Sequence, residues 1–244
     1  MTIKVAVVGA TGRMGKLALE LIDAAQDLSL HAALNSKSQL AELDGADVVF
    51  DVTLPEISPS VVEYCVANGL KVVVGTSGWS AAKLAVVEKQ LETAPSSTAV
   101  IVIPNFSIGS MLASKFAALA APYYESIEIV EAHHAGKIDS PSGTAVRTAE
   151  MIASARADLT QPLIPGVGQE ARGQVVAGVP VHSLRLAGVS AKQEVYFGGI
   201  DEVLTIAHDT VSTKAYTAGI LLCLRKSVAA SGLTVGLQAI VEGK

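Results

Sequence analysis

The sequence is poor in the residues that mark several large classes of protein. Only two cysteines occur in 244 residues, Cys65 and Cys223, and both lie in apolar helical patterns. We therefore expect buried thiols and no disulfide framework. The net charge is −5, and the sequence has neither a basic run nor basic residues interleaved with aromatic ones. This composition argues against nucleic acid as a partner.

Long uninterrupted apolar runs are also missing. The longest uncharged stretch, residues 93–114, has enough residues to cross a bilayer, but Pro95, Pro104, Asn105 and several serines interrupt it. It is better interpreted as a strand, a loop and the start of a helix. The N-terminal residues MTIKVAVVGA reach a turn glycine, Gly9, without the long apolar region of a secretory signal. These absences predict no membrane partner and a cytoplasmic location.

The first hundred residues alternate short β-branched runs with longer helical patterns. The runs are IKVAVV, LSLHAAL, DVVFDV, KVVV and AVIVI. The helical patterns begin near Gly12 and then cover residues 58–68 and 80–92. This alternation is typical of an α/β fold with a Rossmann-type, doubly wound parallel sheet.

The pattern changes after Phe106, where consecutive strands replace the alternation. The expected elements are a helix over 110–124, a strand over 126–134, a helix over 144–156, a Pro/Gly-rich loop over 159–180, and strands over 181–188, 192–198 and 202–209. Such an order predicts a second domain of α+β type with an antiparallel or mixed sheet. The last helix, residues 212–230, is amphipathic and can return to the first sheet. The expected domains are therefore residues 1–106 with 213–244, and an inserted domain of residues 107–212.

A glycine-rich turn follows the first expected strand, in VAVVGATGRMGKLALEL. Gly9, Gly12 and Gly15 lie between this strand and the next helix. Glycines there let the backbone approach a pyrophosphate, whose charge meets free N–H groups at the helix N-terminus. The spacing is G-x-x-G-x-x-G rather than G-x-G-x-x-G, so tight strand-to-helix packing without a nucleotide is the alternative.

The adenosine ribose of a dinucleotide is usually held about 20 residues after the last glycine. Counting from Gly15 reaches Asn35, at the end of the second expected strand. Asparagine can bond a hydroxyl but does not repel a 2′-phosphate, and Arg13 and Lys37 could reach one. We therefore expect NADPH to be accepted at least as well as NADH.

A charged stretch, EAHHAGKIDSPSGTA, occupies residues 131–145. Ser140 followed by Pro141 fits the cap and first position of a helix, whose start also offers the N–H groups of Ser142, Gly143 and Thr144. With Lys137 these groups would make an anion pocket beside a histidine, a side chain suited to proton transfer near neutral pH.

Strand alternation would separate His133 from His134 unless the chain ends or bends near Gly136. An ordinary helix cap beside solvated histidines remains an alternative. So does a metal site formed by His133, His134 and Asp139, with His182 or His208, although the spacing lacks the i, i+4 pattern of a helical zinc motif.

Five motifs resemble the dihydrodipicolinate reductases of bacterial lysine and diaminopimelate synthesis, nearly from end to end. They are GATGRMG at 9–15, DVTLP at 51–55, GTSG at 75–78, PNFSIG at 104–109 and the charged stretch itself. The segments RLAG, QEV and GLTVGL are similar to the actinobacterial branch. The long charged motif is the most specific of these signals.

The resemblance implies an enzyme that uses NADPH or NADH to reduce 4-hydroxy-tetrahydrodipicolinate, a cyclic imine with two carboxylates, to tetrahydrodipicolinate. His133 would donate the proton and Lys137 would assist and bind a carboxylate, with His134, Gly143 and Thr144 as further substrate contacts. Gly9, Ala10, Thr11, Gly12, Arg13 and Met14 would hold the pyrophosphate, and Gly75, Thr76, Ser77, Ile103, Pro104, Asn105 and Phe106 would line the nicotinamide pocket. No metal is implied. The inserted domain would bind the small dicarboxylate substrate and assemble a homotetramer through its sheet.

Two other functions share the first hundred residues. Another two-domain NAD(P)-dependent dehydrogenase of a small amino or keto acid would have no need of HH-x-x-K followed by SPSGT. A dinucleotide-sensing module would bind NAD(P)H without turnover, and His133 and Lys137 weigh against it.

Overall fold

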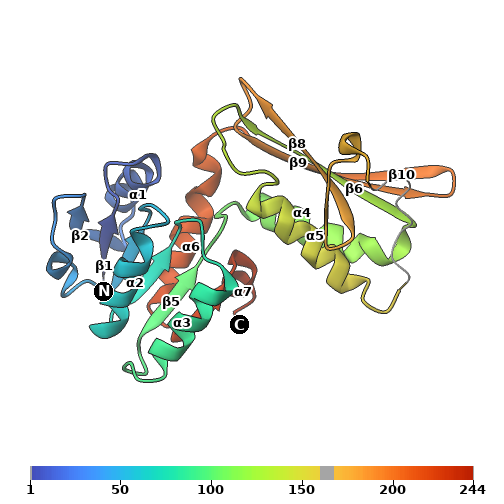
Figure 1. Cartoon of the computed structure of the whole chain (residues 1–244). Helices are drawn as coiled ribbons and strands as arrows, with labels where there is room; N and C mark the ends of the chain where they lie inside the picture. Colours follow the sequence, from blue (N-terminus) through green and yellow to red (C-terminus); the bar gives the residue numbers. More distant parts are fainter. Residues whose placement is uncertain (1, 160–167, 244) are drawn as a thin grey trace. The chain divides into compact units, whose positions relative to one another are not determined.

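The computed structural model describes residues 2–159 and 168–243, and the chain divides into two compact units (Figure 1). One unit comprises Met1–Ser107 and Thr213–Lys244, and the other comprises Ile108–Ser212. The second unit is thus inserted in the sequence of the first. None of the helices in the described residues is long and apolar enough to cross a membrane.

The first unit is built on a parallel sheet of six strands. They are β1 (Ile3–Val8), β2 (Leu28–Leu34), β3 (Val48–Asp51), β4 (Lys71–Val74), β5 (Ala99–Val102) and β11 (Gly232–Val235). Their order is β11-β5-β4-β3-β1-β2, and every neighbouring pair is parallel. All residues of β3 and β5 are buried, as expected of strands covered on both faces. The predicted Rossmann-type architecture is confirmed.

Helices cover this sheet. They are α1 (Arg13–Ala24), α2 (Ser58–Ala67), α3 (Ala81–Leu91), α6 (Thr217–Ser227) and α7 (Leu237–Glu242), with short 3-10 turns η1 (Leu40–Leu43) and η4 (Thr213–Tyr216). The last long helix returns to the first sheet as predicted, since α6 packs against β3, β4 and β5. The sequence patterns did not predict β11 and α7. The strand β11 has only four residues, and its Val235 is half-exposed, so the sequence pattern is too weak to predict a strand. The segment adopts strand geometry by pairing with β5.

The second unit is a mixed sheet of five strands with helices on one face. Its elements are α4 (Ile108–Ala120), η2 (Ala121–Tyr123), β6 (Ser126–His134), α5 (Gly143–Ala155), η3 (Glu170–Arg172), β7 (Gln174–Val176), β8 (Val179–Leu186), β9 (Ala191–Gly199) and β10 (Glu202–Thr210). The strand order is β10-β9-β6-β8-β7, in which only β6 and β8 run parallel. Figure 1 shows α4 and α5 side by side on one face of the sheet, where Ile129 and Phe197 pack with Ile152 in the core.

The prediction of a loop over residues 159–180 was wrong for the part of this range that the structure describes. Residues 160–167 lie outside the described residues, but β7 and the start of β8 form a hairpin within this range. Ala177 and Gly178 both have positive φ in the two-residue connection, as the tight hairpin turns require. The sequence pattern did not indicate the start of β8 because this strand contains Pro180, and proline is uncommon within sheets.

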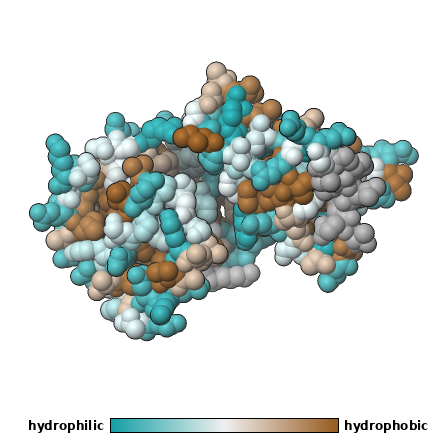
Figure 2. All heavy atoms as spheres, viewed as in Figure 1, coloured by the Kyte–Doolittle hydropathy of each residue, from teal (hydrophilic) through white to brown (hydrophobic). Residues whose placement is uncertain are grey.

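On the face drawn in Figure 2, the hydrophobic residues form several separate groups rather than one continuous surface. Isolated apolar groups of this kind are normal for a folded chain.

Candidate functional site

The loops after four parallel strands lie at one edge of the first sheet. Backbone N–H groups of Gly9 and Ala10 donate to Leu34 O at 3.1 and 3.0 Å, which joins the glycine-rich turn to the end of β2. Gly75 N donates to Asp51 O, and Ile103 N to Val74 O, both at 2.8 Å. The residues predicted for cofactor binding therefore meet at the carboxyl edge of the strands, where α/β sheets bind ligands.

The glycine-rich turn accepts no larger residue at its two ends. Gly9 has φ +87°, and a Cβ on Gly15 would lie 2.2 Å from Gly9 O. The helix α1 begins at Arg13 with neither a side-chain cap nor an acidic residue in its first turn. The first N–H groups of a helix have no partner within it, so Arg13 and Met14, with the preceding Thr11, fit an anionic pyrophosphate. Gly12 N instead donates to Gly9 O at 3.0 Å and shapes the turn.

Asn35 lies directly after β2, beside the same turn. Its Oδ1 accepts a hydrogen bond from Lys37 N at 2.9 Å, and its own N–H donates to Ser38 Oγ at 3.2 Å. The side-chain oxygen thus caps the local turn, so the amide nitrogen of Asn35 is the group that suits a ribose hydroxyl. The exposed position of Lys37 on this turn is compatible with a 2′-phosphate.

The predicted nicotinamide loops are packed against each other. A Cβ on Gly75 would lie 2.7 Å from the ring of Phe106 and 3.0 Å from Val52. Phe106 is buried and meets Phe50 edge to face, with ring centroids 5.6 Å apart. Gly75 is therefore required by the close approach of the two loops.

Asp51 holds these loops together, a role that the sequence patterns did not reveal. Its buried carboxylate accepts hydrogen bonds from Ser58 Oγ, from Thr53 N and Oγ1 at 3.1 and 2.6 Å, and from Thr76 Oγ1 at 3.4 Å. Burial raises the pKa of Asp51 above its ordinary value, although these hydrogen bonds act in the opposite direction. Its place at the end of a buried strand, within DVTLP, was the available signal.

His133 lies near the end of β6 in the second unit, with its side chain largely covered. Its Nδ1 is 2.6 Å from Oε2 of Glu131, which is completely buried. Burial lowers the pKa of His133, the positive charges of Lys137 and Arg185 lower it further, and Glu131 opposes them. The net pKa of His133 is below its ordinary value.

His134 follows within the same strand and is exposed. Because β6 continues through both histidines, regular alternation directs them to opposite faces of the sheet. Its ring lies beside Gly136, where a Cβ would be 3.5 Å from His134 Nδ1. The described geometry does not bring the two imidazoles together.

Lys137 lies in the loop that follows β6. Its Nζ makes two contacts with the carboxylate of Asp139, at 2.7 and 2.8 Å. Its side chain is only 21% exposed, against 63% for Asp139. The expected cation is therefore present, but it has a counter-ion within its own loop.

The start of α5 differs from the expectation. The cap is Ser142 rather than Ser140, its Oγ accepts from Ala145 N at 3.3 Å, and the helix begins at Gly143. Ser142 N donates to Glu131 Oε1 at 3.1 Å and so does not serve an external anion. Gly143 remains open, since a Cβ there would meet nothing within 4 Å. The peptide bond between Ser140 and Pro141 is cis, which the sequence pattern did not predict.

The metal-site alternative finds no support in the geometry. Across the described ranges, no group of three or more His, Cys, Asp or Glu side chains is arranged to hold a metal ion. His182 bonds Glu128 at 2.7 Å instead.

Two family models together match almost the whole chain. The model described as dihydrodipicolinate reductase, N-terminus, matches residues 3–106, and the one described as dihydrodipicolinate reductase, C-terminus, matches residues 109–241. The chain belongs to the dihydrodipicolinate reductase family. The resemblance seen in the motifs is thereby confirmed, and the protein is an NAD(P)H-dependent reductase of lysine and diaminopimelate biosynthesis.

Relatives of this reductase match over nearly its full length. It is 54% identical to the 4-hydroxy-tetrahydrodipicolinate reductase of Clavibacter sepedonicus, over 99% of this chain and 87% of the relative. It is 45% identical to that of Streptomyces griseus, over 98% of both chains. Among solved structures, a dipicolinate-bound dihydrodipicolinate reductase from Paenisporosarcina sp. TG-14 is 31% identical, with a TM-score of 0.80 over 98% of this chain and all of the other.

Two further residues of the reductase contact the predicted site and were missed in the sequence. Arg185, from β8, donates from its two terminal guanidinium nitrogens, NH1 and NH2, to the two carboxylate oxygens of Glu131, at 3.0 Å each. Glu131 was within reach of sequence reasoning, because two residues apart on a strand it shares a face with His133. Arg185 could not be predicted from the sequence, because only the pairing of β6 with β8 places it opposite His133.

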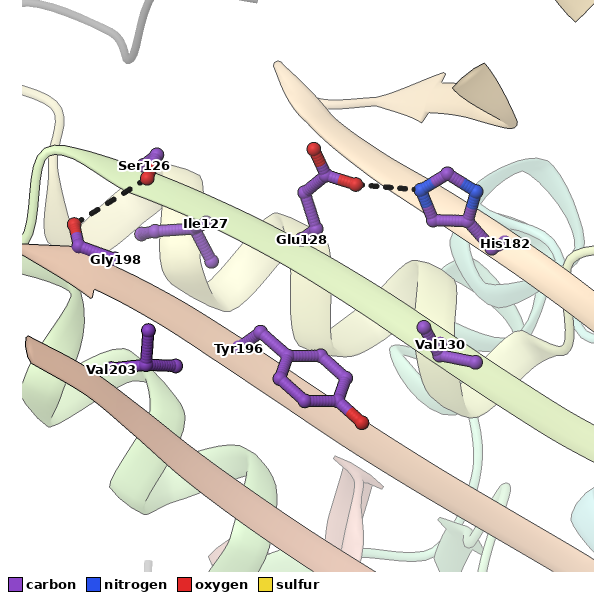
Figure 3. Close-up of a pocket in the computed structure, with 8 residues that line it drawn as sticks. All are labelled: Ser126, Ile127, Glu128, Val130, His182, Tyr196, Gly198 and Val203. Atoms are coloured by element: carbon purple, nitrogen blue, oxygen red, sulfur yellow. Dashed lines mark hydrogen bonds and ion pairs between the residues drawn. The ribbon is translucent and has the colours of Figure 1, made fainter. Parts of the chain in front are cut away.

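A separate hollow lies on the other face of the second sheet (Figure 3). Its volume is about 410 Å³, and its lining residues are Ser126, Ile127, Glu128, Val130, His182, Tyr196, Gly198 and Val203. In the close-up, Glu128 points to His182 while Tyr196 and Val203 border the hollow. Since Glu128 and Glu131 lie on opposite faces of β6, this hollow is distinct from the surroundings of His133.

Proposed function

We propose that His133 is the proton donor of the reductase and that Lys137, with Gly143 and Thr144 at the start of α5, binds a carboxylate of the substrate. The observation that carries this proposal is the contact between His133 Nδ1 and the buried Glu131, beside a loop that holds Lys137. It leaves Nε2 of His133 as the atom that exchanges a proton.

The chemistry requires both groups. The 4-hydroxyl group of the substrate leaves as water, which gives a conjugated imine. NAD(P)H, when bound, would supply a hydride to this imine, and excess electron density would then develop at the far end of the conjugated system. His133 then gives up the proton on Nε2 as a new bond to hydrogen forms on the reduced substrate, and the imidazolium becomes neutral. Lys137 stabilises the negative charge of the dicarboxylate throughout.

Lys137 must exchange partners for this to happen. Its present partner is the largely exposed Asp139, and an exposed ion pair is worth little. A substrate carboxylate that also contacts the N-terminus of α5 replaces Asp139 at low cost. The reductase from Paenisporosarcina sp. TG-14 was solved with dipicolinate bound, which supports a dicarboxylate ligand. His134 is a secondary contact, because its face of β6 differs from that of His133.

The first unit is proposed to hold the dinucleotide. The turn from Gly9 to Met14 would bind the pyrophosphate, Asn35 the ribose, and the loops 75–77 and 103–106 the nicotinamide. Arg13 and Lys37 are the cations that favour NADPH. Titration of both reduced coenzymes into the protein should give an NADPH affinity equal to or greater than that for NADH, and a much weaker NADPH affinity would contradict this part.

The second unit is proposed to assemble a homotetramer through the open face of its sheet, and the reductase to act in the cytoplasm. Val203 and Leu184 on this face are 70% and 45% exposed, and the hollow of Figure 3 lies between its strands. Burial of such a surface between identical subunits would remove exposed apolar area from water.

The catalytic role is tested by His133→Gln. The variant should lose about 10² to 10⁴-fold in kcat, the range of general acid catalysis, in an assay that follows NADPH absorbance with the condensation product of pyruvate and aspartate semialdehyde. NADPH affinity should stay unchanged, since His133 belongs to the other unit. Turnover equal to that of the native protein would remove His133 from the reaction.

A further inference from the structure

Glu131 is a carboxylate with no exposure and with donors on both oxygens. Oε2 is contacted by His133 Nδ1 at 2.6 Å and Arg185 NH1 at 3.0 Å, and Oε1 by Arg185 NH2 at 3.0 Å and Ser142 N at 3.1 Å. These donors come from the same strand, from the neighbouring strand β8 and from the start of α5. A buried charge is retained only when it is paired and hydrogen-bonded in this way.

We propose that Glu131, held by Arg185, is a positioning residue that fixes both the tautomer of His133 and the start of α5. One carboxylate then sets the proton donor and the anion-binding helix end relative to each other. This inference rests on the proton-donor role proposed for His133. It adds a role for Glu131 and Arg185, which the proton transfer itself does not require.

The tautomer follows from what each group can donate. An ionised carboxylate only accepts hydrogen bonds, so Nδ1 of His133 carries a hydrogen whether the ring is neutral or charged. When the imidazolium loses its proton, the N–H bond that breaks is the one at Nε2, and the Nδ1–H bond to Glu131 is kept. Without this partner the neutral ring divides between two tautomers and two ring orientations.

The link to α5 follows from the remaining contacts. Glu131 accepts from Ser142 N, and Arg185 NH2 also donates to Asp139 O at 2.6 Å. The pair therefore ties down both ends of the segment 139–142, next to Lys137. Movement of Glu131 would displace the proton donor and the helix start together.

Opposing charges act on His133 in this arrangement. Glu131 favours the imidazolium, whereas Arg185 from β8 and Lys137 from the following loop disfavour it. Across the other neighbouring strand, β9, His133 is paired with the uncharged Ala191, while Lys192 is bonded to Glu194 at 2.9 Å. Loss of the negative charge at position 131 must therefore lower the pKa of His133.

Glu131→Gln in the full-length protein tests the proposal, because it keeps the shape and removes the charge. We expect kcat to fall at least about tenfold, within the limit of general acid catalysis, with unchanged NADPH affinity. The basic limb of kcat/KM against pH, which reports loss of the proton from the free enzyme, should move to lower pH. Glu131→Asp, which restores the carboxylate, should recover part of the activity and move the limb back.

A spectroscopic measurement distinguishes positioning from a purely structural role. In protein labelled with ¹⁵N-histidine, the His133 signals are those absent from His133→Gln. Native His133 should show the Nδ1–H tautomer at high pH, and Glu131→Gln should shift it toward a mixture. Loss of activity with unchanged tautomer and unchanged pH limb would overturn the proposal, as would native turnover. If Glu131→Gln fails to fold, Arg185→Lys, which loosens the hold on Glu131, should shift the His133 tautomer toward a mixture in the same measurement.

A matched control lies on the same strand. Glu128 contacts His182 at 2.7 Å and Arg172, an equivalent trio on the opposite face of β6. Glu128→Gln removes the same charge and should leave the His133 tautomer and the pH limb as in the native protein. Should His133→Gln retain turnover, the proton-donor role itself fails. If only Glu131→Gln behaves as native, the positioning role alone fails.

Discussion

Single residues in the second unit show how burial and charge compete at a reactive group. Burial raises the pKa of Glu131, yet hydrogen bonds from Arg185, Ser183 and His133 hold it below the ordinary value. Glu131 is therefore ionised near neutral pH and can orient an imidazole. His133 has a lowered pKa in the free protein, where burial and two cations outweigh Glu131. A bound dianion would shift this balance toward the protonated donor.

Replacement of Lys137 by Ala should weaken both binding and rate. A hydrogen bond to a charged group contributes about 1.5 to 3 kcal/mol, so kcat/KM should fall roughly 10- to 150-fold, with a clear rise in KM. Lys137→Arg keeps the charge and is the matched variant. A defect confined to kcat, with native KM, would contradict the proposed carboxylate contact.

Two helix ends are the elements proposed to bind the anionic groups of the cofactor and the substrate. The first turn of α1 lacks a side-chain cap and an acidic residue, which suits an external anion. At α5 the cap is internal, supplied by Ser142, so that fewer N–H groups remain for the substrate. The helices α3 and α5 have the same kind of serine cap, at Ser80 and Ser142.

Ser142→Ala and Ser80→Ala make a matched pair for this element. Each should lower the free energy of unfolding by about 1 kcal/mol, the usual cost of an N-cap, measured by chemical denaturation. Only Ser142→Ala should also raise the KM for the dicarboxylate, because α3 lies in the other unit. Equal effects on KM would mean that the start of α5 is not a substrate contact.

The open face of the second sheet is the surface proposed to assemble the whole molecule into a tetramer. Val203→Glu introduces a charge into the open face of the second sheet, beside the hollow of Figure 3. We expect it to shift the proposed tetramer toward smaller species, measured by light scattering after gel filtration, since burial of an unpaired charge is costly. Val86→Glu, at a site 58% exposed on α3, should leave the native mass unchanged. A native mass for Val203→Glu would locate the assembly surface elsewhere.

Local patterns in the sequence determined most of the fold. Buried β-branched runs and turn glycines were sufficient for β1, β3, β4 and β5 and the helices that follow them, because a strand covered on both faces is apolar throughout. The partly exposed edge strand β2, LSLHAAL, was recognised by its place in the alternation of strands and helices. The glycine-rich turn and the charged stretch were enough to predict the candidate site, because the groups that each motif supplies lie within a few neighbouring residues. Two short strands escaped detection: β11, which becomes a strand only by pairing with the distant β5, and β7, whose hairpin with β8 lies in a stretch rich in proline and glycine.

Tertiary structure decided which groups meet. Arg185 is 54 residues from Glu131, and no local pattern connects them until β6 and β8 pair side by side. Strand alternation alone puts His133 on the face of Glu131 and turns His134 away, whereas the pairing brings Arg185 to both of them. The sequence therefore determined the kinds of groups available for proton transfer and anion binding. Only the packing of strands and helix ends decided their partners, because charge compensation inside a protein depends on distance in space and not on distance along the chain.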